Sequence, residues 1–169
     1  MNAKVFYDQL PNGALVGEMV DHGTMLVLPY PISSNRYWRP VKLGSHISIV
    51  PTKEAKQYRH DVAMLAKAAG VKPINGRVYL SIKLYPHRPQ DWLKRARLSP
   101  DAWDDTVQCI DLGNCEKVLS DALNGIAWHD DKQHRKIILE RMTPDEHGAR
   151  VVVEFWSDPT PATAPELPL

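Results

Sequence analysis

The sequence has few cysteines, almost no net charge and no long apolar run. Its two cysteines, Cys109 and Cys115, are too few for a disulfide framework or a four-ligand zinc site, which favours a reducing compartment. A net charge of +1 excludes a polycationic coat protein and an acidic disordered chain. No segment reaches the roughly 18 apolar residues of a membrane span, and the first residues lack the pattern of a secretory signal. We therefore expect a cytoplasmic protein with no membrane partner.

The length of 169 residues, with 43% hydrophobic and 24% charged residues, indicates one soluble domain with tails. Residues 1–23 show little periodicity, so we expect an arm or a loose first hairpin there. Residues 24–157 carry the regular patterns and form the expected domain. Residues 158–169 are rich in proline, which predicts a disordered tail.

Charge is distributed unevenly along the chain. Residues 31–97 contain fourteen Lys or Arg against three acids, whereas residues 101–131 contain eight acids against one base. A basic surface attracts a polyanion by releasing its condensed counterions. Carboxylates beside that surface repel the same polyanion unless a cation lies between them. Solvated charge in accidental blocks is the alternative that composition leaves open.

Apolar periodicity predicts a mixed α/β fold of the α+β type. Alternating or short apolar runs predict strands at residues 25–29, 77–85, 136–142 and 150–156. Apolar residues at three-to-four spacing predict a helix at 52–69, capped by Thr52, and a second from Asp111 to Gly125. We expect loops at 31–39, 86–107 and the turn 143–148. The order β-α-β-α-β-β predicts a mixed sheet with helices packed on one face.

Acidic residues gather at both ends of the second helix. Asp111 precedes it, and Asp130 and Asp131 follow it. If the loop after Gly125 folds back along the helix, these carboxylates converge beside Lys117. Carboxylates next to a lysine suit a Mg²⁺ site that activates water and stabilises a phosphodiester leaving group. Helix capping by Asp111 and ordinary surface roles for the others are the alternatives.

Four sequence blocks, in order, resemble the RusA family of Holliday junction resolvases. The blocks are PISSNRYWR at 31–39, DLGNCEK at 111–117, DALNG at 121–125 and WHDDKQ at 128–133. The resemblance covers residues 25–156. It implies a homodimer of mixed α/β subunits that binds four-way DNA junctions and nicks two opposed strands symmetrically. It also implies Mg²⁺ or Mn²⁺ held by aspartates.

The resemblance assigns roles by position. Asp111 matches the first motif aspartate, Asn114 the asparagine, Lys117 the catalytic lysine and Asp131 the late aspartate. Asp111, Lys117 and Asp131 are therefore the expected catalytic residues.

One position departs from the family pattern Asp-x-Asp-Asn, because Gly113 stands where the second aspartate belongs. Three accounts are open. The substitution inactivates the enzyme and leaves a binder; Glu116, three residues on and on the same helix face, compensates for it; or Asp130 or Asp104 takes its place. We prefer Glu116, so the expected metal ligands are Asp111, Asp131, Asp130 and Glu116.

Basic residues gather in the first loop and the helix that follows it. They are candidates for phosphate contacts, which position DNA without reading its sequence. With two asparagines of the matched blocks, the expected DNA-binding residues are Asn35, Arg36, Arg39, Lys42, Lys56, Arg59 and Asn114. For Tyr37 and Trp38 we favour packing under the loop over stacking on unpaired bases.

Three functions follow from these patterns. The leading one is a Mg²⁺-dependent, structure-selective endonuclease that resolves junctions in DNA recombination and repair. The second is a catalytically impaired junction-binding protein on the same fold. The third is an α/β interaction module without a nucleic-acid role, whose basic residues would scatter over the fold.

Overall fold

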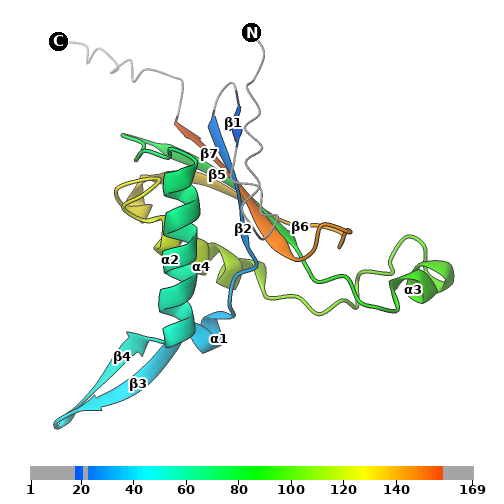
Figure 1. Cartoon of the computed structure of the whole chain (residues 1–169), viewed down its shortest axis with the longest axis horizontal. Helices are drawn as coiled ribbons and strands as arrows, with labels where there is room; N and C mark the ends of the chain where they lie inside the picture. Colours follow the sequence, from blue (N-terminus) through cyan, green and yellow to red (C-terminus); the bar gives the residue numbers. More distant parts are fainter. Residues whose placement is uncertain (1–17, 21–22, 158–169) are drawn as a thin grey trace, which may run out of the picture.

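The computed structural model describes residues 18–20 and 23–157 of the chain (Figure 1). The predicted tail at 158–169 and most of the predicted arm at 1–23 lie outside these residues. The described elements are β1 (Glu18–Val20), β2 (Gly23–Pro29), α1 (Ser34–Tyr37), β3 (Trp38–Leu43), β4 (His46–Pro51), α2 (Lys53–Ala68), β5 (Val78–Tyr85), α3 (Trp92–Leu98), α4 (Leu112–Leu123), the 3-10 turn η1 (Asp131–Gln133), β6 (His134–Arg141) and β7 (Arg150–Ser157).

Five strands form a mixed sheet in the order β1-β2-β7-β5-β6. β5 pairs with β6 in parallel, and the other neighbours are antiparallel. The fold is therefore α+β with a mixed sheet, as predicted. The turn at 143–148 joins β6 to β7, but these strands are not neighbours, because β5 lies between them.

The core lies between one face of this sheet and the helices α2 and α4 (Figure 1). Strand residues alternate between faces, so Leu80, Ile82 and Leu84 of β5 point to the same buried side as Val153 of β7. Trp128 is fully buried and packs edge-on against Phe155, with ring centroids 5.9 Å apart. This packing fixes the segment that follows α4 against the sheet.

Local signals explain where the two long helices begin and end. The Thr52 side chain accepts a hydrogen bond from the amide of Ala55, and the chain leaves α2 through Gly70 at a φ of +72°. α4 begins after Asp111 and ends at Leu123. Gly125, the first glycine beyond the end of α4, has a φ of +77°. Both predicted helices and all four predicted strands are confirmed, with ends that differ by a few residues.

Two segments predicted as loops contain regular structure, so that prediction was wrong. The segment from 31 holds α1 and leads into the hairpin β3–β4, and the segment 86–107 holds α3. The hairpin and α3 project away from the sheet and the long helices, whereas α1 packs against α2 and α4 (Figure 1). α3 buries none of its residues, and Ile47 and Ile49 of the hairpin are 75% and 70% exposed. Neither element therefore carries the amphipathic pattern that packing against a core produces.

None of the described helices is both long and apolar enough to span a bilayer.

Candidate active site and nucleic-acid interface

α4 carries the first group of candidate residues at its N-terminus. The Oδ1 atom of Asp111 accepts hydrogen bonds from the amides of Gly113 at 2.8 Å and Asn114 at 3.2 Å. Asp111 therefore caps the helix while its side chain stays exposed. A Cβ atom built on Gly113 would meet only this same Oδ1, at 3.2 Å. A side chain there requires this oxygen to shift by a few tenths of an ångström, and a carboxylate would face the carboxylate of Asp111.

A charged cluster lies further along α4. It is centred on Asp121, which is partly buried, and burial raises the pKa of its carboxyl group. The positive charges of Lys117 and Arg59 oppose this rise in pKa, whereas the negative charges of Asp131 and Glu116 add to it. Three elements thus contribute to one cluster: α4, α2 through Arg59, and the turn before β6 through Asp131.

His134 borders this cluster. Burial lowers the pKa of its ring, and the nearby charges of Glu116 and Asp131 oppose that shift. The ring lies edge-on to Trp128, with centroids 4.6 Å apart. The segment after Gly125 therefore does return alongside α4, and it brings Asp131 toward Glu116.

Two of the expected metal ligands already have local hydrogen-bond partners. The Ser120 hydroxyl donates to Oε1 of Glu116 at 2.6 Å. Asp130 caps η1 by accepting from the amide of Lys132 at 2.9 Å, and this bond lowers the pKa of Asp130. Gln133 completes a capping box by accepting from the amide of Asp130. Asp130 thus shapes the turn that presents Asp131.

The carboxylates fit a divalent ion only in part. Their oxygens are the hard donors that Mg²⁺ prefers, and one or two carboxylates commonly hold this ion together with phosphate and water. Glu116 and Asp131 supply that number on one side of α4. Within residues 18–20 and 23–157, however, no three acidic, histidine or cysteine side chains are placed to share a metal ion. These residues therefore suit an ion that is completed by a DNA phosphate.

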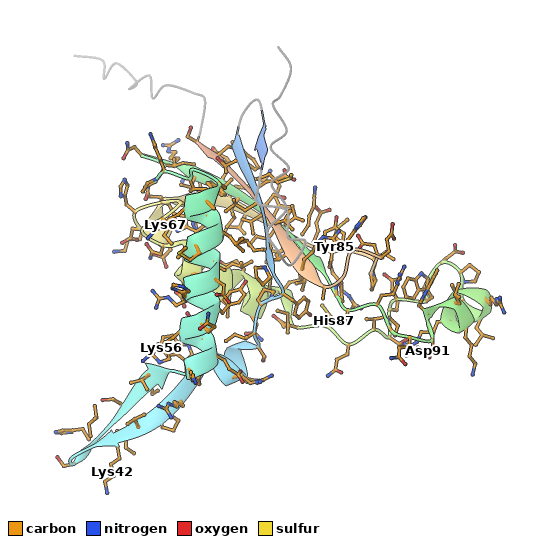
Figure 2. The ribbon with its side chains drawn as sticks, in the orientation of Figure 1. Lys42, Lys56, Lys67, Tyr85, His87 and Asp91 are labelled. Carbon is orange, nitrogen blue, oxygen red and sulfur yellow. The ribbon has the colours of Figure 1, made fainter. Side chains whose placement is uncertain are left out.

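The basic candidate DNA-binding side chains are exposed and lie on neighbouring elements. Arg36 of α1 forms an ion pair with Glu54 at 2.8 Å, whereas Arg39 and Lys42 project from the hairpin. Lys56 lies on the half of α2 next to this hairpin, and Lys67 lies on the other half (Figure 2). Arg59 belongs to the same half of α2 as Lys56. The basic candidate residues of α1, the hairpin and α2 therefore share one region of the protein.

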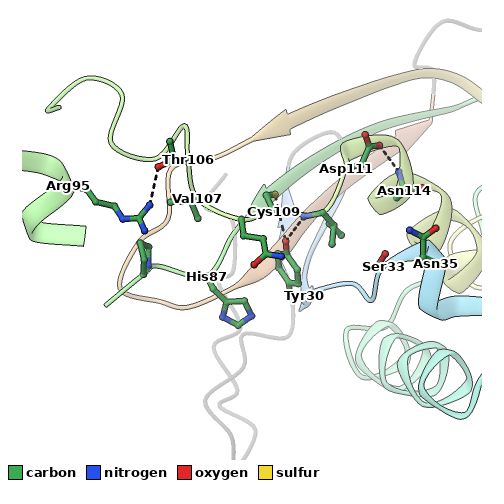
Figure 3. A pocket seen from close by; sticks show the side chains of 13 residues that line it. Tyr30, Ser33, Asn35, His87, Arg95, Thr106, Val107, Cys109, Asp111 and Asn114 are labelled. Carbon is green, nitrogen blue, oxygen red and sulfur yellow. Dashed lines mark hydrogen bonds between the residues drawn. The ribbon is translucent and has the colours of Figure 1, made fainter. Parts of the chain in front are cut away.

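A cavity of about 750 Å³ opens beside the start of α4. Figure 3 shows Asp111, Asn114 and Asn35 at one end and Arg95 and Thr106 at the other. Two candidate DNA-binding residues, Asn35 and Asn114, therefore line a pocket rather than an open surface. The segment between β5 and α4 supplies much of the remaining lining.

Sequence reasoning assigned no role to two features of the candidate site. Asp121 lies four residues after Lys117, a spacing that places both on one helix face, so this signal was available. The pocket depends on how the segment 86–110 folds back toward Tyr30, and local sequence carries no signal for that contact.

Comparison with known proteins supplies the family. The model of the family described as endodeoxyribonuclease RusA matches residues 29–155, about three quarters of the chain. No curated protein matches the sequence. The match spans the sheet from the end of β2 to β7 and includes α4 with every candidate site residue. The chain therefore belongs to the RusA family of endodeoxyribonucleases.

Proposed function

We propose that this protein is a divalent-metal-dependent endonuclease that resolves four-way DNA junctions in recombination and repair. The observation that carries the proposal is the charged cluster of α4, in a chain of an endodeoxyribonuclease family. There, acidic Glu116 and Asp131 adjoin basic Lys117 and Arg59. A phosphodiester drawn to the basic side would thus meet hard oxygen donors.

Each candidate residue has a chemical role in this proposal. Asp131 and Glu116 would hold Mg²⁺ or Mn²⁺, which when bound would activate water for attack on phosphorus, and Asp111 would join them only once DNA and the ion are bound. Lys117 is exposed and stabilises the negative charge that develops on the phosphoryl oxygens. Asp130 shapes the turn that presents Asp131.

We also propose that the protein acts as a homodimer. A four-way junction has near-twofold symmetry, and an isologous dimer presents two equivalent sites to it. Paired, symmetric nicks follow from that match. The projecting hairpin and basic α2 of each subunit would contact the DNA arms through phosphates.

The test is cleavage of synthetic four-way junctions labelled at each 5′ end, with Mg²⁺ or Mn²⁺, against linear duplex of the same sequence. We expect paired nicks in opposed strands of the junction and none in the duplex. The variant Lys117→Ala should still bind junctions but should not nick them. If neither the chain nor Gly113→Asp cuts a junction, the nuclease proposal fails.

One observation favours a second candidate function. Gly113 removes a carboxylate that the family pattern contains, and the described residues offer no three-ligand metal group. A junction-binding protein without nuclease activity would have such an incomplete set of metal ligands. Tight, salt-sensitive binding to junctions with no nicking in either metal would identify it.

A further inference from the structure

The pocket beside α4 has a lining that the charged cluster does not explain. Tyr30 and His87 place two rings in it, with centroids 5.4 Å apart and planes inclined by 50°. The amide side chains of Asn35, Gln108 and Asn114 reach the same cavity. Each amide can donate and accept hydrogen bonds, and each ring offers a flat apolar face.

The pocket is rigidly built on the Tyr30 side. The Tyr30 hydroxyl accepts a hydrogen bond from the amide of Ile110 at 3.0 Å and donates to Sγ of Cys109 at 3.6 Å. Burial raises the pKa of this hydroxyl to about 12, so it stays protonated. The ring is therefore held in place before any ligand arrives, which lowers the entropy cost of binding.

The opposite wall is braced as well. Arg95 of α3 donates to Thr106 at 3.0 Å and to Asp91 at 2.9 Å. Arg141 of β6 donates to the carbonyls of Asp104 at 2.7 Å and Val107 at 2.9 Å. The projecting segment is thus tied to the sheet at the point where it forms the pocket.

The charges of the lining identify the kind of ligand. Arg95 is paired with Asp91, and Asp111 brings a negative charge to the other end. A site for a free phosphate would have an excess of positive charge, and this pocket has none. Rings and neutral amides instead match a flat, uncharged group with hydrogen-bonding edges, and a volume of about 750 Å³ is large enough for one.

We infer that this pocket binds an unpaired nucleobase of the DNA strand whose phosphodiester lies at Asp111. The inference rests on the proposed function, because Asp111 belongs both to the pocket and to the candidate active site. The base stacks on His87, the exposed ring of the pair, and Gln108 reads its edge. Proteins hold unpaired bases in this way, by stacking on aromatic rings and histidine and by hydrogen bonds to their edges.

The test is a binding scan with abasic sites in Ca²⁺, which does not require cleavage. Synthetic junctions carry a single abasic site at each successive position around the branch point, and the full chain is titrated against each. We expect one position at which loss of the base weakens binding about 5- to 140-fold, the range for one stacked base.

Variants connect that position to the pocket. In His87→Ala the abasic penalty should disappear, whereas His147→Ala, an exposed histidine that does not line the pocket, should keep it. Gln108→Ala should keep the penalty but lose any preference among the four bases at that position.

The outcomes separate this inference from the proposed function. A flat abasic profile, or a penalty that His87→Ala leaves intact, overturns the pocket inference even where the chain binds junctions tightly. A chain that does not distinguish junctions from duplex overturns the proposed function and this inference with it.

Discussion

At the scale of the residue, Gly113 decides how well the site can hold a metal ion. Its position accepts a side chain if Oδ1 of Asp111, which an added Cβ would meet at 3.2 Å, shifts by a few tenths of an ångström. An aspartate there would repel Asp111 unless a cation lies between the two carboxylates. We expect Gly113→Asp to raise Mg²⁺-dependent junction nicking by at least about tenfold, which needs only about 1.4 kcal/mol of barrier reduction.

The matched control for this prediction is Gly113→Asn. Both variants replace glycine by a residue whose helix propensity is more favourable by only about 0.3 kcal/mol, so neither should change stability by much. Only the aspartate adds a negative ligand. Equal nicking rates for the two variants would show that the missing carboxylate does not limit activity.

Asp121 supplies a prediction for pH dependence. Burial raises the pKa of its carboxyl above the usual 3.8, so the folded state binds a proton more tightly there than the unfolded state does. The contribution of Asp121 to the free energy of unfolding therefore falls as the pH rises from 3.8 through the raised pKa. Asp121→Asn should raise the melting temperature at pH 7 more than at pH 4. Melting curves in which the variant loses the same stability at both pH values would contradict this assignment.

At the scale of the element, the hairpin β3–β4 is separable from the core. Its base is fixed by the amide of Thr52, which donates to the carbonyl of Tyr37 at 2.9 Å, and by the Thr52 hydroxyl, which donates to the carbonyl of Arg36 at 2.8 Å. Replacing residues 40–49 with a short Gly-Ser turn should change the melting temperature by no more than about 3 °C, because little core area is lost.

Junction binding should respond differently to the same change. The shortened hairpin removes Lys42 and the exposed isoleucines, which lie on the surface proposed to contact DNA. We expect affinity for junctions, measured by titration at fixed salt, to fall about tenfold, since phosphate contacts dominate such affinities. The variant Lys42→Gln, with the hairpin intact, shows how much of the loss is charge alone. Unchanged affinity in the shortened chain would place the DNA elsewhere.

The same elements show what sequence can and cannot predict. α2 and α4 bury one face, so their residues repeat at helical spacing and their caps, Thr52 and Asp111, stand at the expected positions. α3 and the hairpin bury almost nothing, and exposed elements leave no periodic signal. The cluster around Asp121 was predictable in part, because Lys117 and Asp121 lie four residues apart on one helix face. The contact of Tyr30 with Ile110 joins residues 80 apart, and such pairings depend on the whole fold.

At the scale of the whole molecule, the uneven charge of the sequence predicts a salt dependence. Lys56 lies on the half of α2 beside the hairpin and Lys67 at its other end (Figure 2). Lys53 is the first residue of α2, Lys72 follows its last turn, and all four side chains are exposed. Each phosphate contact contributes about 0.9 to the slope of log affinity against log salt. Exchanging Lys53 and Lys56 for glutamine should lower the slope by about 2, whereas the same exchange at Lys67 and Lys72 should leave it unchanged. Equal slopes for the two double variants would show that α2 does not contact the DNA phosphates.

The ties that hold the segment 86–110 have a consequence for how this protein can diversify. The segment lies between β5 and α4, and Tyr30 and Arg141 hold it near its C-terminal end through hydrogen bonds to Ile110, Asp104 and Val107. Surface connections of this kind accept insertions and deletions at a small entropic cost. A relative with a shorter or longer segment would keep the candidate catalytic residues of α4. It would acquire another base preference in the DNA beside the cleaved bond. Chemistry and selectivity can thus evolve as separate modules.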